Sequence, residues 1–132
     1  MDGVTIGIQI CFDLWFPEMA REQLLKGADI FCVPANFGST ITHKIAGIRA
    51  VENLTPLVLC NRVGQEEDTN IQAYFLGRSS IFNVDGGYIR KGVDDIEICM
   101  VSEVHLPDKR GNAISNDILS EIRKHYPVTT NS

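Results

Sequence analysis

The sequence predicts a single α/β domain built on a mixed sheet, and three observations support this prediction. Runs typical of strands alternate with runs typical of helices along much of the chain. A strand, a helix and a second strand follow one another within residues 4–34, which is typical of a βαβ unit with parallel strands. The triplet Asp-Gly-Gly at 85–87 predicts a hairpin and so adds antiparallel strands. At 132 residues, the chain has room for one such domain.

The βαβ unit begins with a strand that we expect at 4–10. Side chains alternate between the two faces of a strand, so four apolar residues share one face: Val4, Ile6, Ile8 and Ile10. Cys11 leaves this strand on the opposite, more polar face. The helix is expected at 17–26, because a proline suits its first turn and a glycine follows its last residue. The second strand is expected at 29–34.

The same alternation continues in the middle of the chain. A helix is expected at 42–54, with Thr42 as its candidate N-cap. Its predicted apolar stripe consists of residues at helical spacing: Ile45, Ile48, Val51 and Leu54. A short buried strand is expected at 56–61. The polar, acidic stretch at 62–74 is predicted to be a loop.

The last third of the chain predicts antiparallel strands and a closing helix. The segments 79–84 and 88–91 flank the Asp-Gly-Gly turn and are predicted to pair as a hairpin. A further strand is expected at 96–104. The stretch 116–126 is predicted to be a helix that ends at Pro127.

Composition and charge exclude several classes of protein. With 44% hydrophobic and 22% charged residues, the chain is typical of a globular protein. The formal net charge is −5 and no basic stripe stands out, which argues against a nucleic-acid partner. No apolar run approaches the roughly 20 residues of a membrane span. Residues 1–7 lack the features of a secretory signal, so we expect a cytoplasmic protein without a membrane partner.

The cysteines do not form the close pairs typical of metal sites. Four cysteines and three histidines are dispersed along the chain: Cys11, Cys32, Cys60, Cys99, His43, His105 and His125. None of the cysteines forms a C-x-x-C pair, so neither a zinc site nor a disulfide framework is expected, and no cofactor is predicted. The last three cysteines lie inside apolar runs and are expected to be buried structural thiols.

Cys11 differs from the other cysteines in its surroundings. It is expected at the carboxyl end of a parallel strand and just before a helix, where α/β folds usually bind ligands. Backbone N–H groups at the start of the helix can stabilise a thiolate there. They can also donate to an oxyanion that forms beside the sulfur. Cys11 is therefore the candidate nucleophile of the chain.

The segment around Cys11 contains a characteristic series of residues: Cys11, Phe12, Asp13, Phe16, Pro17, Glu18, Gly27, Ala28, Asp29, Pro34, Ala35 and Asn36. In the identity and order of these residues, the segment resembles the cysteine region of the carbon–nitrogen hydrolase superfamily, the nitrilase-type amidases. Phe37 stands where the family usually has tryptophan. The resemblance continues through "RAVENLTPLVLCNRVG" at 49–64 and "FLGRSSIFNVDG" at 75–86, and reaches "LSEIRKHYP" near the end. It covers nearly the whole chain.

This resemblance implies a fold and a reaction. The fold would be half of a four-layer α-β-β-α sandwich. The reaction would be hydrolysis of a non-peptide C–N bond in a small amide or N-carbamoyl substrate, with Cys11 as nucleophile and a thioester intermediate. The Phe12 N–H would form part of the oxyanion hole, and Asn36 and Phe37 would face the substrate pocket. The "CFD" sequence is more similar to amidases and carbamoylases than to true nitrilases.

The family's glutamate base and its lysine usually lie upstream of the cysteine, where this chain offers neither. The sequence is therefore expected to be the C-terminal half of such an enzyme and to be inactive alone. The nearby charged residues are expected to be structural: Asp13, Glu18, Lys26, Arg49 and Glu52. For Asp13, a local hydrogen bond and an ion pair with an arginine such as Arg62 remain alternatives. Half of a double-sheet sandwich would also expose an apolar sheet face, so we expect a homo-oligomer.

Two other classes of function remain open from the sequence. The chain could be a non-catalytic binding or scaffolding module that retains the fold. It could also be a redox or metal-binding α/β protein, although the cysteine spacing gives this little support. A thiol probe distinguishes the catalytic hypothesis, because an activated Cys11 would react faster than an ordinary cysteine.

Overall fold

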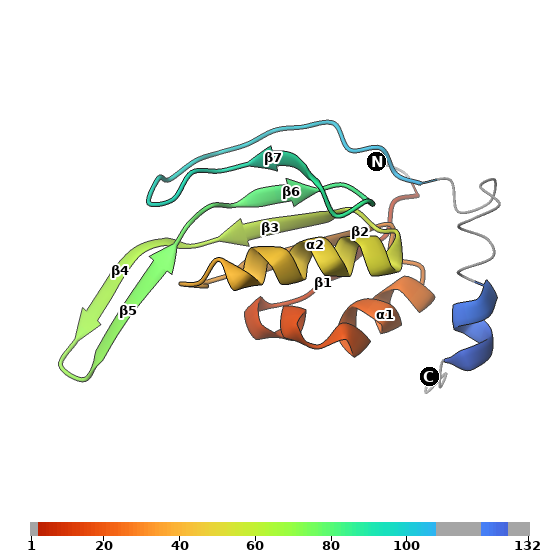
Figure 1. Cartoon of the computed structure of the whole chain (residues 1–132), viewed down its shortest axis with the longest axis horizontal. Helices are drawn as coiled ribbons and strands as arrows, with labels where there is room; N and C mark the ends of the chain where they lie inside the picture. The colour runs from red at the N-terminus through yellow and green to blue at the C-terminus, as the bar shows by residue number, and fades with distance from the viewer. Residues whose placement is uncertain (1–2, 108–119, 127–132) are drawn as a thin grey trace.

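A computed structural model describes residues 3–107 and 120–126. In chain order the elements are β1 (Ile6–Ile8), the 3₁₀ turn η1 (Cys11–Trp15), α1 (Pro17–Leu25), β2 (Ile30–Ala35), α2 (Ile41–Asn53), β3 (Leu57–Asn61), β4 (Val63–Asp68), β5 (Ile71–Leu76), β6 (Ser80–Phe82) and β7 (Tyr88–Lys91). A five-stranded sheet has the order β1-β2-β3-β6-β7, and β4 and β5 form a separate two-stranded sheet (Figure 1). The predicted α/β fold class with a mixed sheet is confirmed.

The βαβ unit forms as the sequence predicts. β1, β2 and β3 are parallel, whereas β6 and β7 add antiparallel strands on one side of the sheet. Helix α1 begins at Pro17, which has the backbone angle that a first helical turn needs. Just beyond the end of α1, Gly27 has a φ of 96°, a left-handed conformation that glycine adopts without steric cost. The parallel strands therefore direct their carboxyl ends, and Cys11 after β1, toward one edge of the sheet.

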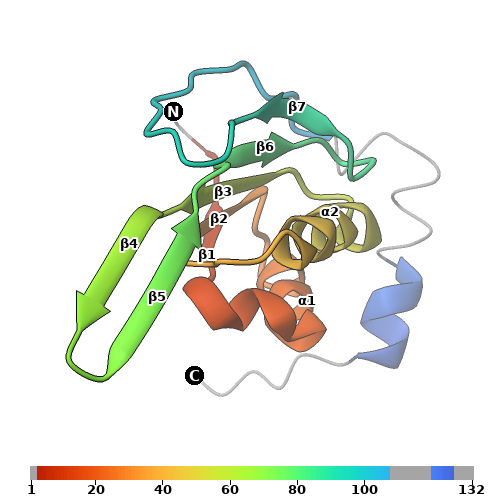
Figure 2. The ribbon, with the colours of Figure 1, turned by 60° about the vertical axis from the view of Figure 1, so that its left-hand side comes forward.

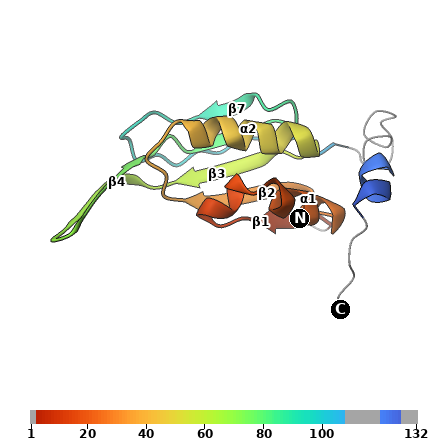
Figure 3. The same ribbon diagram turned by 60° about the horizontal axis from the view of Figure 1, so that its bottom comes forward.

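The hydrophobic core lies between the sheet and the two helices, which sit together on one face (Figures 1 and 3). β2 and β3 contribute alternate side chains to this core, and α1, α2 and η1 cover them. The fully buried apolar residues at its centre are Leu14, Ala20, Phe31, Ala46, Ala50, Leu57 and Leu59. This packing fixes the turn that carries Cys11 against α2.

Within residues 3–107 and 120–126, no helix covers the opposite face of the sheet (Figure 3). On β1, the exposed side chains are the apolar ones: Ile6 is 55% exposed and Ile8 is 60% exposed. The same face includes Cys32 and Val58, which are half-buried, and Cys60, which is exposed. The prediction that Cys32, Cys60 and Cys99 are buried is therefore wrong. The first two lie on the uncovered face, and Cys99 lies in an exposed segment without regular structure.

Helix α2 packs only part of its predicted apolar stripe against the core, namely the half-buried Ile45. Ile48 and Val51 are 50% and 44% exposed, and the buried positions are held by small or polar residues instead: Thr42, His43, Ala46, Gly47, Arg49, Ala50 and Asn53. The small residues permit a close approach: a Cβ at Gly47 would lie 2.8 Å from the Gly86 carbonyl oxygen in the β6–β7 turn. Close backbone packing has outweighed hydrophobic periodicity here.

Further predictions differ from the structure. The N-cap of α2 is Thr40 rather than the predicted Thr42, which is buried inside the helix. The stretch 62–74 is a hairpin, β4 and β5, which extends away from the five-stranded sheet (Figure 2). Its β4 side chains from Gln65 to Asp68 are exposed, so no alternation of apolar residues marks it as a strand. The stretch 96–104 forms no strand. Of the predicted helix 116–126, residues 120–125 are helical, and residues 116–119 lie outside the described part of the chain.

The helices of the described residues are all too short or too polar to cross a membrane.

Candidate active site

Cys11 is the first residue of η1 and has a left-handed backbone conformation, with a φ of 50°. A positive φ is uncommon in residues other than glycine and costs on the order of 1–3 kcal/mol. Asp13 stabilises the turn: its carboxylate accepts a hydrogen bond from the Ile10 N–H at 3.0 Å, and its own N–H donates to the Ile10 carbonyl at 3.1 Å. Of the two alternatives for Asp13, the local hydrogen bond is the one observed. Strain of this kind, held by the surrounding structure, is typical of functional turns.

Arg49 holds the other end of the same turn. Its Nε donates to the Leu14 carbonyl and its Nη2 to the Trp15 carbonyl, both at 3.0 Å. Its Nη1 also forms an ion pair with Glu52 Oε1 at 2.9 Å, and the Arg49 side chain is only 9% exposed. The prediction that Arg49 and Glu52 are structural agrees with these contacts. They connect α2 directly to the segment that follows the candidate nucleophile.

The thiol of Cys11 contacts the end of the neighbouring strand. β1 and β2 are parallel, so Asn36, which follows β2, and Cys11, three positions beyond the end of β1, lie at the same edge of the sheet. Cys11 Sγ donates a hydrogen bond to Asn36 Oδ1 at 2.8 Å. The structure therefore brings together two of the four residues that the sequence predicts for the site.

The other two predicted site residues are aromatic. The Phe12 ring is 59% exposed and lies among aromatic neighbours, 5.8 Å from the Trp15 ring and 5.5 Å from the Phe16 ring between centroids. The Phe37 ring is half-buried and packs against the core. The aromatic rings of Phe12, Trp15 and Phe16 therefore form an apolar cluster in the segment that follows Cys11. Phe37 belongs to the loop that follows β2.

Within residues 3–107 and 120–126, no hydrogen bond or ion pair joins Cys11 to a carboxylate or an amine. Glu52 pairs with Arg49, and Lys26 pairs with Glu22 at 2.6 Å on the surface of α1. Arg62 pairs with Glu66 at 2.8 Å rather than with Asp13. In the same part of the chain, no three His, Cys, Asp or Glu side chains are close enough to hold a metal ion. The described residues therefore provide a thiol, Cys11, and its hydrogen-bond acceptor, Asn36.

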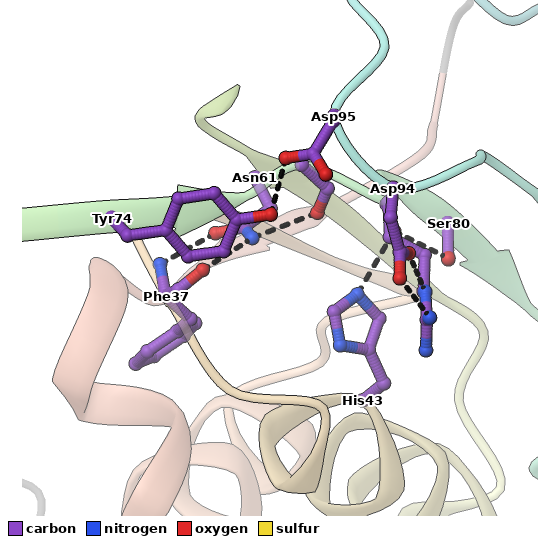
Figure 4. Close-up of polar contacts among 9 residues, drawn as sticks. Phe37, His43, Asn61, Tyr74, Ser80, Asp94 and Asp95 are labelled. Atoms are coloured by element: carbon purple, nitrogen blue, oxygen red, sulfur yellow. Dashed lines mark hydrogen bonds and ion pairs between the residues drawn. The ribbon is translucent and has the colours of Figure 1, made fainter. Parts of the chain in front are cut away.

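A second polar network was not predicted from the sequence (Figure 4). Arg78, which has a φ of 56°, binds Asp94 with two hydrogen bonds from its guanidinium. The Arg78 carbonyl accepts hydrogen bonds from His43 Nε2 at 2.9 Å and from Ser80 Oγ at 2.8 Å. Tyr74 donates to Asp95 next to it. This network connects the start of α2 to the turn between β5 and β6.

His43 gives this network a pH dependence. Burial lowers the pKa of His43 below its usual 6.5, with the positive charges of Arg78 and Lys91 acting in the same direction. The hydrogen bond to the Arg78 carbonyl and the charge of Asp94 oppose this shift. The folded chain therefore binds fewer protons at His43 than the unfolded chain as the pH falls below 6.5.

We expect the contribution of His43 to the free energy of unfolding to be fully present above pH 6.5 and to be lost progressively as the pH falls below 6.5. His43→Gln should remove this part of the pH dependence, because the amide can donate to the same carbonyl without titrating. Chemical denaturation at several pH values measures the pH dependence of the free energy of unfolding, and His105→Gln, at an exposed histidine, is the control. If His43→Gln leaves this pH dependence unchanged, His43 is not its source.

Residues 1–107 match the family model described as "Carbon-nitrogen hydrolase". The chain belongs to this family. A nitrilase from Pyrococcus abyssi is 35% identical over 125 residues, covering 93% of this chain and 46% of that protein. An N-carbamoylputrescine amidase from Oryza sativa subsp. japonica is 35% identical over 118 residues, covering 79% of this chain and 39% of that protein.

Solved structures show the same fold. A carbon-nitrogen hydrolase from Helicobacter pylori G27 superposes with a TM-score of 0.70 at 26% identity, covering 99% of this chain and 47% of that one. A mutant amidase from Nesterenkonia sp. AN1, with acrylamide added at its active site cysteine, superposes with a TM-score of 0.63 at 26% identity. The match covers 72% of this chain and 37% of that one. The chain therefore spans less than half the length of these relatives. The matches confirm the family but do not bear out the narrower prediction that the chain is its C-terminal half.

Proposed function

We propose that this chain supplies the cysteine nucleophile of a hydrolase that cleaves non-peptide C–N bonds in amide or N-carbamoyl substrates. The observation that carries the proposal is the state of Cys11. Its backbone is left-handed, it begins the turn that follows the parallel strand β1, and its thiol donates a hydrogen bond to Asn36 at 2.8 Å. The relatives named as a nitrilase and an N-carbamoylputrescine amidase support this class of substrate.

The proposed reaction proceeds through a thioester. Cys11 Sγ attacks the carbonyl carbon while its proton passes to a general base, and the carbonyl π electrons move onto the oxygen. The Phe12 N–H donates to this oxyanion, and Asn36 and Phe37 contact the substrate. When the electrons return, the C–N bond breaks and the base protonates the leaving nitrogen. Water then adds to the thioester carbon, the C–S bond breaks, and the thiol recovers its proton.

We propose that the general base, a glutamate, and the oxyanion-stabilising lysine come from outside residues 1–132. The reason is chemical: the Asp13 carboxylate is engaged in the turn itself, and the Glu52 carboxylate is engaged with Arg49, which binds the same turn. The 132-residue chain alone is therefore expected to release no ammonia from amides or N-carbamoyl compounds, whereas the whole protein should.

Thiol labelling tests the nucleophile in the chain itself. Iodoacetamide labelling followed by peptide mass spectrometry gives separate rates for Cys11 and for Cys60, which is more exposed. We expect Cys11 to react faster despite its lower exposure, as the attacking thiol of the proposed mechanism should. A Cys11 that reacts more slowly than Cys60 would favour a binding or scaffolding module that retains the fold.

The uncovered sheet face supports a homo-oligomer. Large apolar side chains rarely remain exposed together in a soluble monomer, yet Ile6, Ile8 and Ile10 are each more than half exposed. A second copy of the chain could bury this face against its own. We propose that the 132-residue chain associates with itself in this way.

Ile8→Lys is expected to convert the oligomer to a monomer, because it places a charge in the middle of the apolar face. Light scattering coupled to gel filtration measures the mass. The matched control is Ile48→Lys, which changes an isoleucine that is 50% exposed on α2, on the covered side of the sheet. If the control dissociates the oligomer and Ile8→Lys does not, then the helical face forms the interface.

A further inference from the structure

We infer that Asn61 is a positioning residue for Cys11: it fixes the peptide of Phe37 and so holds Asn36, the acceptor of the thiol hydrogen bond, in place. The catalytic meaning of this inference rests on the proposed function. The structural linkage does not, and it can be tested without any substrate.

The side chain of Asn61 makes its hydrogen bonds to backbone groups beyond its own strand. Its Oδ1 accepts from the Phe37 N–H at 2.7 Å, and its Nδ2 donates back to the Phe37 carbonyl at 2.9 Å (Figure 4). Nδ2 also donates to the Gly77 carbonyl at 2.8 Å. Both backbone groups of Phe37 are therefore bound by one side chain, which is only 6% exposed.

The position of Asn61 in the sheet explains this arrangement. β2 and β3 stay in register up to the pair of Ala35 and Asn61, and the Arg62 N–H makes the next backbone bond, to the Ala35 carbonyl at 2.8 Å. Beyond this point, the Asn61 side-chain amide binds the N–H and the carbonyl of Phe37, as the backbone of a neighbouring strand would do. The backbone of Asn61 is itself held by Ser79, whose hydroxyl accepts from its N–H at 2.9 Å and donates to its carbonyl at 3.2 Å.

The loop after β2 is also held from its other side, by β5. The Leu76 N–H donates to the Phe37 carbonyl at 3.0 Å. A Cβ at Gly38 would lie 2.3 Å from the Tyr74 carbonyl oxygen, which shows how closely the two backbones approach. The loop thus has little freedom to shift. Asn36 precedes Phe37 directly, so the fixed peptide of Phe37 determines where Asn36 Oδ1 can lie relative to the thiol.

Asn53 offers a matched control, because it is also buried and also donates to a backbone carbonyl. It is 1% exposed, and its Nδ2 binds the Arg49 carbonyl at 2.8 Å one turn earlier in α2. An asparagine that only satisfies buried backbone groups should behave like Asn53. An asparagine that positions Cys11 should change the surroundings of the thiol as well as the stability.

The experiment measures the S–H stretching band of Cys11 by Raman spectroscopy in the 132-residue chain. The difference spectrum between the wild type and Cys11→Ala identifies the band among the four cysteines. The S–H stretching band of a thiol that donates to an oxygen lies at lower wavenumber than that of a free thiol. The spectrum of Asn36→Ala therefore gives the wavenumber expected when the hydrogen bond is lost. We expect Asn61→Ala to move the band toward that value and Asn53→Ala to leave it in place.

A second pair of variants covers the case in which Asn61→Ala does not fold. Asn61→Asp keeps the acceptor for the Phe37 N–H but places an acceptor oxygen against the Phe37 and Gly77 carbonyls, so it should shift the band in the same direction. Gly38→Ala leaves Asn61 intact and displaces the loop from the β5 side, so it should also move the band. A band that stays in place in Asn61→Ala or Asn61→Asp overturns the inference, even if Gly38→Ala moves it.

In the whole protein, Asn61→Ala is expected to lower kcat by about 10²-fold, the usual effect of a small misplacement of reacting groups. Asn53→Ala, at equal occupancy of the folded state, should change kcat less than about threefold. Equal losses in both variants would overturn the inference. Failure of the proposed function has a different signature: turnover would survive Cys11→Ala, whatever the Raman band does.

Discussion

Replacing Cys11 by alanine is expected to lower the kcat of the whole protein by at least about 10⁴-fold, as the loss of a catalytic nucleophile usually does. The physical reason is that no other thiol shares the position of Cys11 at the end of β1. The fold should survive, because alanine is smaller and the lost hydrogen bond to Asn36 involves a weak donor. Ammonia release measures turnover, and circular dichroism measures the fold.

The matched control is Cys60→Ala, which removes the same atom from the exposed face of β3. It should leave kcat within about twofold, as expected for a surface substitution. Wild-type turnover in Cys11→Ala would refute the proposed mechanism. Loss of turnover in Cys60→Ala with a stable fold would mean that the reacting thiol lies on the uncovered face.

The sequence predicts the parts of the fold that local signals determine. Pro17 and Gly27 mark the ends of α1 because their backbone preferences act within one or two residues. The parallel pairing of β1 and β2 follows from the length of the connection, since parallel strands need a crossover. The proximity of Cys11 and Asn36 follows in turn, because the carboxyl ends of adjacent parallel strands meet at one edge.

Features that depend on distant packing are the ones that the sequence does not predict. The buried face of α2 is chosen by the close approach of Gly47 to Gly86, 39 positions away in the chain, and hydrophobic periodicity carries no such information. The same holds for Asn61, whose partner Phe37 lies 24 positions earlier. A polar residue at the end of a strand gives no sign of the distant peptide that it binds. The left-handed φ of Cys11 is likewise visible only in the structure.

Arg49→Met is expected to lower the free energy of unfolding by about 3 kcal/mol, the usual cost of removing one partner from a buried charged network. Methionine fills similar space but donates no hydrogen bond. The carbonyls of Leu14 and Trp15 would lose their donors, and Glu52 would lose its ion pair. Urea denaturation at a fixed chain concentration measures the change, since association would otherwise contribute to the stability.

Comparison with Glu52→Gln separates the two roles of Arg49. Glu52 is 30% exposed, so solvent screens its charge, and Glu52→Gln should cost less than about 1 kcal/mol because both carbonyl bonds of Arg49 remain. Arg49→Lys should fall between the two variants, since one ammonium cannot reproduce the planar fork that reaches both carbonyls. If Glu52→Gln costs as much as Arg49→Met, the ion pair would be the main contribution. The turn after Cys11 would then be held by its own hydrogen bonds rather than by α2.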